Sequence, residues 1–182
     1  DEFVLYQACA QMRRWLDAGY PLRSMAVNMS GYWMERGDVV SSTRQALTQA
    51  GLEPAHLELE VTEDEMMQHG ERGEHLLDRL AELGVRLAID DFGTGYSSLL
   101  RLKRMPVNKL KIDRGFISDL PGNSSDSAMA RAIIALGKSL QLTITAEGIE
   151  TLAQEALLKE YGCDTGQGYL YNQPLPAAEV EK

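Results

Sequence analysis

Cysteine is scarce in this sequence, and long apolar runs are absent. Only Cys9 and Cys163 occur among 182 residues, and no Cys-x-x-Cys pair is present, which argues against a disulfide framework and a cysteine-based zinc site. A reducing compartment suits such a chain, so we expect a cytoplasmic location. No stretch approaches the roughly 20 apolar residues of a membrane span, and the first residues show no signal peptide.

Positive charge is also in deficit, with 18 Lys and Arg against 27 Asp and Glu and a net charge of −9. Proteins that bind duplex nucleic acid usually carry a basic stripe, so we do not expect that class of partner. Clustered carboxylates can instead hold hard divalent cations, which allow an acidic protein to bind a phosphate ligand. The hydrophobic fraction of 44% is typical of a soluble globular domain with a real core.

The apolar periodicity predicts strands and helices that alternate along the chain. Helical spacing starts at the third residue, which indicates a helix cut near its beginning, in a chain that is the later part of a longer one. We expect strands over 25–29, 57–61, 85–89, 109–112, 142–146 and 165–170. We expect helices over 3–15, 38–50, 71–83, 97–103, 125–139 and 151–161.

This alternation predicts an α/β fold with a parallel sheet, which a doubly wound open sheet and a (β/α) barrel both satisfy. A (β/α)8 TIM-type barrel needs eight βα units and about 250 residues. The chain offers six such units in 182 residues, which fits an incomplete barrel whose first strands are missing. No linker divides the chain, so we expect residues 1–182 to be one domain, truncated at its N-terminus.

Polar side chains stand at or near the end of nearly every predicted strand. In α/β folds, ligands bind at the carboxyl ends of the strands. Each polar residue alone has an ordinary explanation as a turn, cap or solvated residue, but carboxylates converging on one rim would repel one another without cations. The residues in question are Asn28, Glu60, Glu63, Asp90, Asp91, Lys111, Asp113, Glu147, Glu150 and Gln167.

Oxygen donors without histidine or cysteine select Mg²⁺ or Mn²⁺ over zinc. Two such ions about 3.5–4 Å apart are the usual device for hydrolysing a phosphodiester. An adjacent aspartate pair can serve both ions, and a nearby lysine can orient the attacking hydroxide. Two alternatives stay open on the residues alone: a metal-dependent barrel of the enolase type, and a nucleotide-binding module without turnover.

Six segments resemble the EAL domain family in order and spacing over the whole chain. They are AVNMS around Asn28, ELEVTE around Glu60, DDFGTGYSSL from Asp90, KLKID from Lys109, AEGIET from Ala146 and QGYLYNQPLP from Gln167. The resemblance implies a (β/α)8 barrel that hydrolyses cyclic di-GMP to linear pGpG with Mg²⁺ or Mn²⁺. It also implies a homodimer and a part in bacterial signalling and biofilm control, in the cytoplasm or as the cytoplasmic domain of a larger sensor protein.

The resemblance implies metal ligands at five positions. Asn28, Glu60 and Asp90 match ligands of one ion, and Asp90 matches the bridging ligand. Asp91 and Glu147 match ligands of the second ion.

The same resemblance implies roles beside the metals. Lys111 matches the lysine that contacts the hydrolytic water, and Glu147 matches the general base. Gln167 matches a guanine-contacting residue, and Glu150 matches an acid that supports the second metal site. Glu63 matches the anchor of the glycine-rich loop after the aspartate pair, a loop that lies by the dimer contact.

One departure concerns the tripeptide after which the family is named. No Glu-Ala-Leu occurs on an early predicted strand, and the string at 155–157 falls inside the predicted helix 151–161. We expect the family's glutamate to lie upstream of Asp1, in a fragment, with a non-catalytic cyclic di-GMP receptor as the alternative. Asn172 and Gln173 stand where the family often has Ser-Arg, which affects ligand affinity and leaves the chemistry untouched.

Overall fold

The computed structural model describes residues 1–95 and 99–180, which fall into two compact units. The described part of the first unit comprises 1–89 and 99–108, and that of the second comprises 90–95 and 109–180. Strand β3 (Arg86–Phe92) belongs to both units, because the division falls within it, between Ile89 and Asp90.

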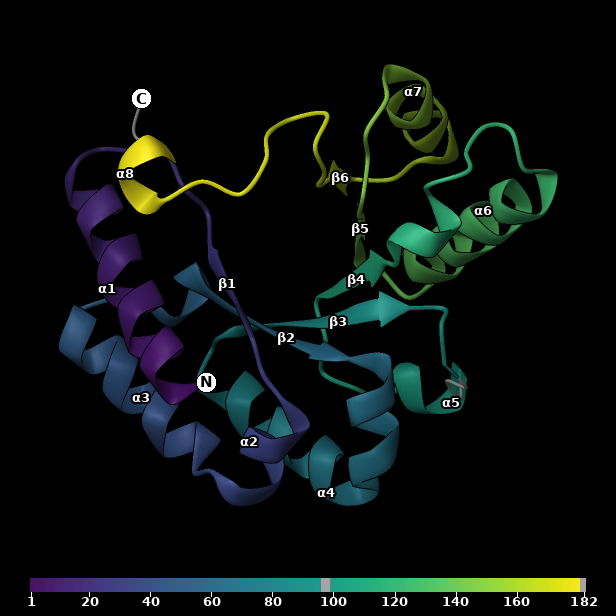
Figure 1. The fold of residues 1–182 in the computed structure, drawn as a ribbon. Coiled ribbons are helices and arrows are strands. Elements are labelled where there is room, and N and C mark those ends of the chain that lie inside the picture. The colour runs from purple at the N-terminus through teal and green to yellow at the C-terminus, as the bar shows by residue number, and fades with distance from the viewer. Residues whose placement is uncertain (96–98, 181–182) are drawn as a thin grey trace. The chain divides into compact units, whose positions relative to one another are not determined.

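The first unit contains two paired parallel strands and the helices that cover them. Its elements are α1 (Glu2–Asp17), β1 (Met25–Asn28), α2 (Gly31–Arg36), α3 (Val39–Ala50), the 3₁₀ turn η1 (Pro54–His56), β2 (Leu57–Thr62), α4 (Glu63–Glu82), the start of β3, and α5 (Leu99–Leu102). Strands β1 and β2 pair from Met25 opposite Leu57 to Asn28 opposite Glu60. Helices α1 and α3 lie side by side, and α1 also packs on β1 (Figure 1).

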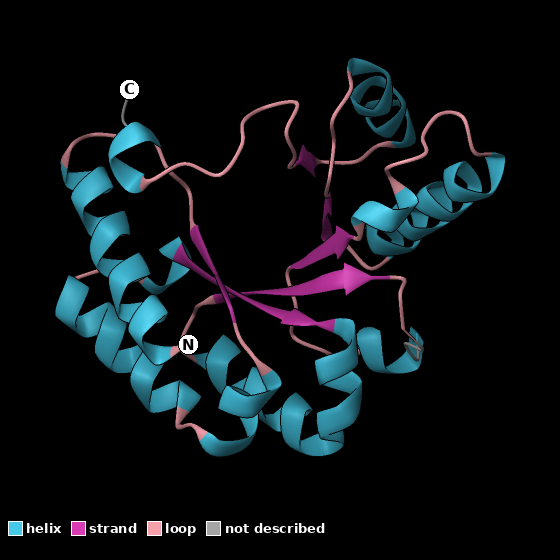
Figure 2. Cartoon of the chain, in the orientation of Figure 1, coloured by secondary structure: helices cyan, strands magenta, loops and turns pink. Residues whose placement is uncertain are grey.

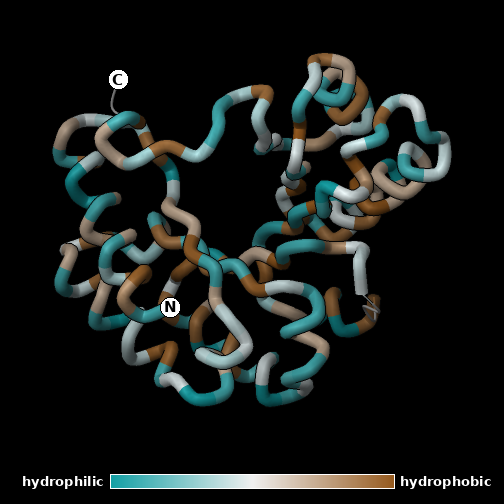
Figure 3. The backbone as a smooth tube through the Cα atoms, viewed as in Figure 1, coloured by the Kyte–Doolittle hydropathy of each residue, from teal (hydrophilic) through white to brown (hydrophobic). Residues whose placement is uncertain are grey.

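Amphipathic helices and a buried strand build the core of the first unit. Leu5, Cys9 and Met12 recur at helical spacing on α1 and are fully buried. Along α1 and α3 the hydropathy colours in Figure 3 alternate between hydrophilic and hydrophobic, as expected for helices with one apolar face. Strand β2 is buried along 57–61 on both of its faces, which is typical of a parallel sheet. The acidic side chains of β2 therefore stand on a closely packed element.

The second unit repeats the alternation of strand and helix. Its elements are the end of β3, β4 (Lys109–Ile112), the 3₁₀ turn η2 (Arg114–Phe116), α6 (Ser124–Ser139), β5 (Thr143–Ala146), α7 (Leu152–Tyr161), β6 (Thr165–Gly166) and α8 (Ala177–Val180). Strands β4, β5 and β6 are parallel neighbours in chain order, and α6 packs on β4, β5 and α7 (Figure 2). Ile112 stands opposite Ala146, so β4 and β5 end at the same edge of the sheet.

The structure confirms the predicted α/β class with parallel strands and agrees closely with several predicted boundaries. The strands that begin at residues 25, 57 and 109 and the helices around 125–139 and 151–161 are present. The string Glu155–Ala156–Leu157 lies inside α7, as predicted. Within the described ranges, no helix combines the length and apolar character that a membrane crossing requires.

Three predicted elements were wrong in extent. The strand predicted over 85–89 extends to Phe92 and contains Asp90 and Asp91. The helix predicted over 71–83 starts at Glu63, because Thr62 and Glu65 form a capping box at its N-terminus. A break at Gly70, where φ is 53°, separates the early part of α4 from the predicted part. The strand predicted over 165–170 ends at Gly166, after which the chain turns back toward the loop that follows β5.

Candidate functional site

Three carboxylates form a compact cluster in the second unit. Asp90 and Asp91 lie near the end of β3, and Glu147 directly follows β5. One oxygen from each lies within 4.8 Å of the others. The backbone N–H of Glu147 donates to the carbonyl of Ile112, at 3.1 Å, so pairing with β4 continues to the cluster. Three oxygen donors this close are the ligand type that Mg²⁺ and Mn²⁺ prefer.

Lys111 of β4 stands between two of these acids. Its Nζ lies 3.0 Å from Asp90 Oδ1 and 2.7 Å from Glu147 Oε1, and its side chain is only 6% exposed. A buried ammonium group is tolerated when carboxylates pair with it. The alternation of parallel strands thus brings together the lysine and three acids that the sequence singled out.

Asp91 is held under electrostatic and conformational strain. Burial, followed by the charges of Asp90 and Asp113, raises the pKa of the Asp91 carboxyl, and nearby Lys111 opposes the shift only in part. Its φ of 52° lies in the left-handed region, which non-glycine residues seldom adopt. The N–H of Asp91 donates to Asp90 Oδ1 at 3.0 Å, and the Thr94 hydroxyl donates to the Asp91 carbonyl at 2.9 Å. A bound cation would relieve the repulsion between these acids.

A cavity of about 510 Å³ opens beside the cluster. This volume is within the range of ligand pockets in proteins. Its walls combine four carboxylates with one guanidinium, one amide and one aromatic ring. The lining residues are Asp91, Asp113, Arg114, Glu147, Gly148, Glu150, Gln167, Gly168 and Tyr169.

Two loops are joined by backbone hydrogen bonds along one wall of this cavity. The N–H of Gln167 donates to the carbonyl of Ala146 at 2.9 Å, and the N–H of Ile149 donates to the carbonyl of Gln167 at 3.0 Å. The N–H of Leu170 donates to the carbonyl of Ile149 at 2.9 Å. A Cβ on Gly168 would lie 2.1 Å from the Ile149 carbonyl oxygen, so only glycine permits this approach. These contacts hold Gln167 beside the segment that carries Glu147.

The remaining predicted residues lie in the first unit. Asn28 ends β1 and pairs in register with Glu60, whose carbonyl accepts the N–H of Met29 at 2.8 Å. Glu60 and Glu63 are both buried. That Asn28 and Glu60 complete a metal site with Asp90 stays a prediction. Glu63 begins α4, and part of the loop it was predicted to anchor, residues 96–98, lies outside the described residues.

Apart from its two glycines, the cavity is lined by three residues to which the sequence assigned no role, Asp113, Arg114 and Tyr169. Asp113 directly follows β4, and its spacing of two from Lys111 indicates a shared strand face. Arg114 directly follows the motif KLKID, and Tyr169 lies within QGYLYNQPLP. Whether these residues reach the cavity depends on how the loops turn after the strands. Hydrophobic periodicity does not predict that path.

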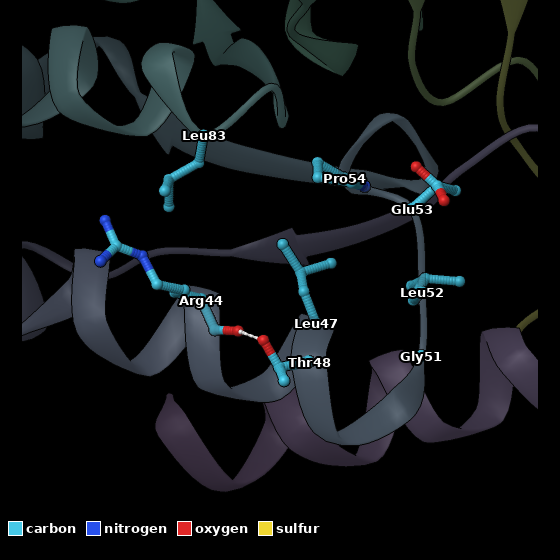
Figure 4. Close-up of a pocket in the computed structure, with 8 residues that line it drawn as sticks. All are labelled: Arg44, Leu47, Thr48, Gly51, Leu52, Glu53, Pro54 and Leu83. Atoms are coloured by element: carbon cyan, nitrogen blue, oxygen red, sulfur yellow. Dashed lines mark hydrogen bonds between the residues drawn. The ribbon is translucent and has the colours of Figure 1, made fainter.

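A separate hollow of about 390 Å³ in the first unit is lined by fewer acids than the cavity beside the carboxylate cluster (Figure 4). The Thr48 hydroxyl donates to the carbonyl of Arg44 at 2.8 Å, so it is already used within α3. The described residues that line this hollow include one acid, Glu53, and we assign no chemistry to it. The lining residues are Arg44, Leu47, Thr48, Gly51, Leu52, Glu53, Pro54 and Leu83.

Comparison with known proteins gives consistent matches. The model of the EAL domain family matches residues 1–174. The bifunctional diguanylate cyclase/cyclic di-GMP phosphodiesterase MucR of Pseudomonas aeruginosa is 49% identical over 179 residues, which are 98% of this chain and 26% of MucR. The cyclic di-GMP phosphodiesterase NbdA of the same organism is 48% identical over 182 residues, 100% of this chain and 23% of NbdA.

A solved structure, the PaMucR phosphodiesterase in complex with c-di-GMP, matches with a TM-score of 0.95 at 49% identity. The match covers 98% of this chain and 72% of that chain. The predicted TIM-barrel fold class is thereby confirmed. The chain spans about a quarter of the length of the two curated relatives, with 26% and 23% covered.

Proposed function

The chain belongs to the EAL domain family, and we propose that it hydrolyses cyclic di-GMP to linear pGpG. The observation that carries this proposal is the position of Lys111 between Asp90 and Glu147, at the cluster that these acids form with Asp91. Two relatives of 49% and 48% identity carry the name cyclic di-GMP phosphodiesterase, which supports the same activity here.

Divalent cations fit the donor set of this site. Asp90, Asp91 and Glu147 offer oxygen atoms that converge within 4.8 Å, and Asn28 at the end of β1 pairs in register with Glu60 of β2. Asn28, Glu60 and Asp90 would hold one ion, and Asp91 and Glu147 would hold a second. When bound, Mg²⁺ or Mn²⁺ would offset the charge of a phosphodiester and acidify a water molecule.

The protein's own groups then position the reactants. Lys111 pairs with Asp90 and Glu147 and orients the attacking water by hydrogen bonding. Glu147 accepts a proton as the oxygen of water bonds to phosphorus, and one P–O bond of the cyclic dinucleotide breaks. The released ribose oxygen takes up a proton, so a linear dinucleotide with a terminal phosphate results.

Three further residues take supporting roles in this proposal. Gln167 contacts a guanine base in the cavity, and Glu150 supports the acids around Glu147. Glu63 anchors the loop that follows Asp91. A solved structure of 49% identity is a complex with c-di-GMP, which supports this dinucleotide as the ligand.

We extend the proposal to a homodimer. Leu99 and Leu100 of α5 are 58% and 61% exposed, and adjacent exposed leucines favour burial against a partner. Light scattering from the full-length protein measures its oligomeric state. A dimer that Leu100→Glu dissociates supports this part of the proposal, and a wild-type monomer at micromolar concentration contradicts it.

The test of function is hydrolysis by the full-length protein, with the linear product followed by chromatography in Mg²⁺ or Mn²⁺. We expect pGpG to form and Asp91→Asn to abolish its formation. Asp119→Asn is the matched control, because Asp119 is an exposed acid of the same unit that does not line the cavity. Binding of cyclic di-GMP without any product would instead support a receptor that signals to a partner.

A further inference from the structure

Arg114 is the one cationic side chain among the described residues that line the cavity. Its neighbours there include four acids, Asp91, Asp113, Glu147 and Glu150. Even so, within the described part of the chain the structure gives the Arg114 side chain no hydrogen bond and no ion pair. Its guanidinium therefore keeps its donors available at the edge of an acidic cavity.

The backbone of Arg114 is held by hydrogen bonds, and the start of its side chain is held by packing. Its guanidinium group is not held in this way. The Arg114 carbonyl accepts the N–H groups of Ile117 and Ser118 at 3.0 and 2.9 Å. Asp113 caps the short turn by accepting the N–H of Gly115 at 2.9 Å. A Cβ on Gly148 would lie 2.6 Å from the Cβ of Arg114, so the loop after β5 packs directly on the arginine stem. This packing fixes the start of the arginine side chain beside the cavity that Arg114 lines.

The walls of the cavity suit a nucleobase next to a phosphate. Asp91 and Glu147 belong to the acidic cluster, where cations and a phosphodiester would be held. Gln167 and Tyr169 supply an amide and an exposed ring to the same cavity, and such groups bind base edges and faces. A guanidinium donates two parallel hydrogen bonds to O6 and N7 of guanine. Adenine has an amino donor in place of O6, so it cannot accept both bonds.

We infer that Arg114 reads the O6–N7 edge of a guanine base and thereby sets the preference for guanine over adenine dinucleotides. This inference rests on the proposed function and adds the residue that selects the base. Arg114 is a specificity residue in this arrangement. It takes no part in the bond-breaking step, which belongs to the groups around Lys111.

The experiment compares binding of cyclic di-GMP and cyclic di-AMP to the full-length protein by calorimetry, in EDTA so that no turnover occurs. We expect Arg114→Ala and Arg114→Gln to weaken cyclic di-GMP binding about 10- to 100-fold and to leave cyclic di-AMP binding nearly unchanged. Arg131→Ala is the matched control, because Arg131 of α6 stands over the Tyr161 ring, 6.0 Å from its centroid, and is not among the residues lining the cavity. Unchanged circular dichroism would show that each variant folds.

A modified ligand isolates the contact itself. Cyclic di-GMP with 7-deazaguanine bases lacks the N7 acceptor, so it should bind the wild type more weakly and bind Arg114→Ala as tightly as the unmodified ligand does. An equal loss for both natural dinucleotides would assign Arg114 to the phosphate and overturn the inference, as would unchanged affinity in both variants. A wild type that neither binds nor hydrolyses cyclic di-GMP would overturn the proposed function itself.

Discussion

The ammonium group of Lys111 lies 2.7 Å from Glu147 Oε1 and 3.0 Å from Asp90 Oδ1. This arrangement places one buried positive charge against two closely spaced acids before any ligand arrives. The deep burial of Lys111 indicates that its positive charge has a role in the site.

The first prediction concerns Lys111→Met, which keeps most of the stem and removes the charge. We expect turnover of cyclic di-GMP to fall at least about 100-fold, since Lys111 orients the attacking water. The free energy of unfolding should fall by about 2 kcal/mol, because two carboxylates lose their partner. Steady-state kinetics and urea titration measure the two effects. Lys138→Met is the control for turnover alone, because Lys138 lies outside the cavity and its pairing with Asp164 contributes to stability. Wild-type turnover in Lys111→Met would refute the role of this lysine.

The second prediction concerns removal and return of divalent cations. EDTA should abolish hydrolysis, and Mg²⁺ or Mn²⁺ should restore it. Because Asp90, Asp91 and Glu147 converge within 4.8 Å, bound metal should also raise the melting temperature. At 100 times the dissociation constant, binding contributes about 2.7 kcal/mol of stability. Differential scanning fluorimetry should show a clearly smaller shift in Asp91→Asn. If the variant responds to metal as the wild type does, Asp91 is not a ligand.

The arrangement around Lys111 could be predicted because it follows from strand order. Parallel strands separated by helices place their carboxyl ends at one edge, so residues near the ends of β3, β4 and β5 had to approach one another. The early start of α4 was also predictable, because Thr62 and Glu65 have the spacing of a capping box.

Other parts of the site could not be predicted because they depend on how loops meet. The close contact between Gly168 and Ile149 joins two separate loops, and no local sequence pattern includes both of them. The contact of Gly148 with the Arg114 stem is of the same kind. Hydrophobic periodicity describes elements one at a time, and it carries no information on such contacts.

The third prediction concerns Gly168→Ala. A Cβ at this position would lie 2.1 Å from the Ile149 carbonyl oxygen, so the two loops must separate. We expect a loss of about 2 kcal/mol in unfolding free energy and weaker binding of cyclic di-GMP, because Gln167 moves with its loop. Chemical denaturation and calorimetry measure these changes. At Gly122 a Cβ would meet its nearest neighbour at 3.4 Å, so Gly122→Ala should change neither quantity appreciably. Equal behaviour of the two variants would show that the loop contact is dispensable.

The fourth prediction concerns the pH dependence of stability at Asp164. One Asp164 oxygen pairs with Lys138, and the other accepts the N–H of Ile144 at 2.8 Å. Burial alone would raise the pKa of the Asp164 carboxyl, but these hydrogen bonds outweigh it and hold the pKa below its usual value. The unfolded carboxyl titrates near pH 3.9. The stabilisation is therefore present above that pH and is lost as the pH falls through the lower, folded pKa.

Asp164→Asn removes the charge and keeps an oxygen that can accept the Ile144 N–H. At pH 7 we expect the variant to be less stable by about 1 kcal/mol, a modest value because the side chain is 34% exposed and solvent screens the pair. Urea titrations at pH 7, 5 and 3 should show the difference constant at the two higher values and shrinking below them. Asp119→Asn, which changes an exposed acid, should show little difference throughout. The difference in unfolding free energy between wild type and Asp164→Asn could instead persist undiminished well below pH 3. That result would mean that the size and shape of the Asp164 side chain, and not its charge, account for its role in joining β5 to β6.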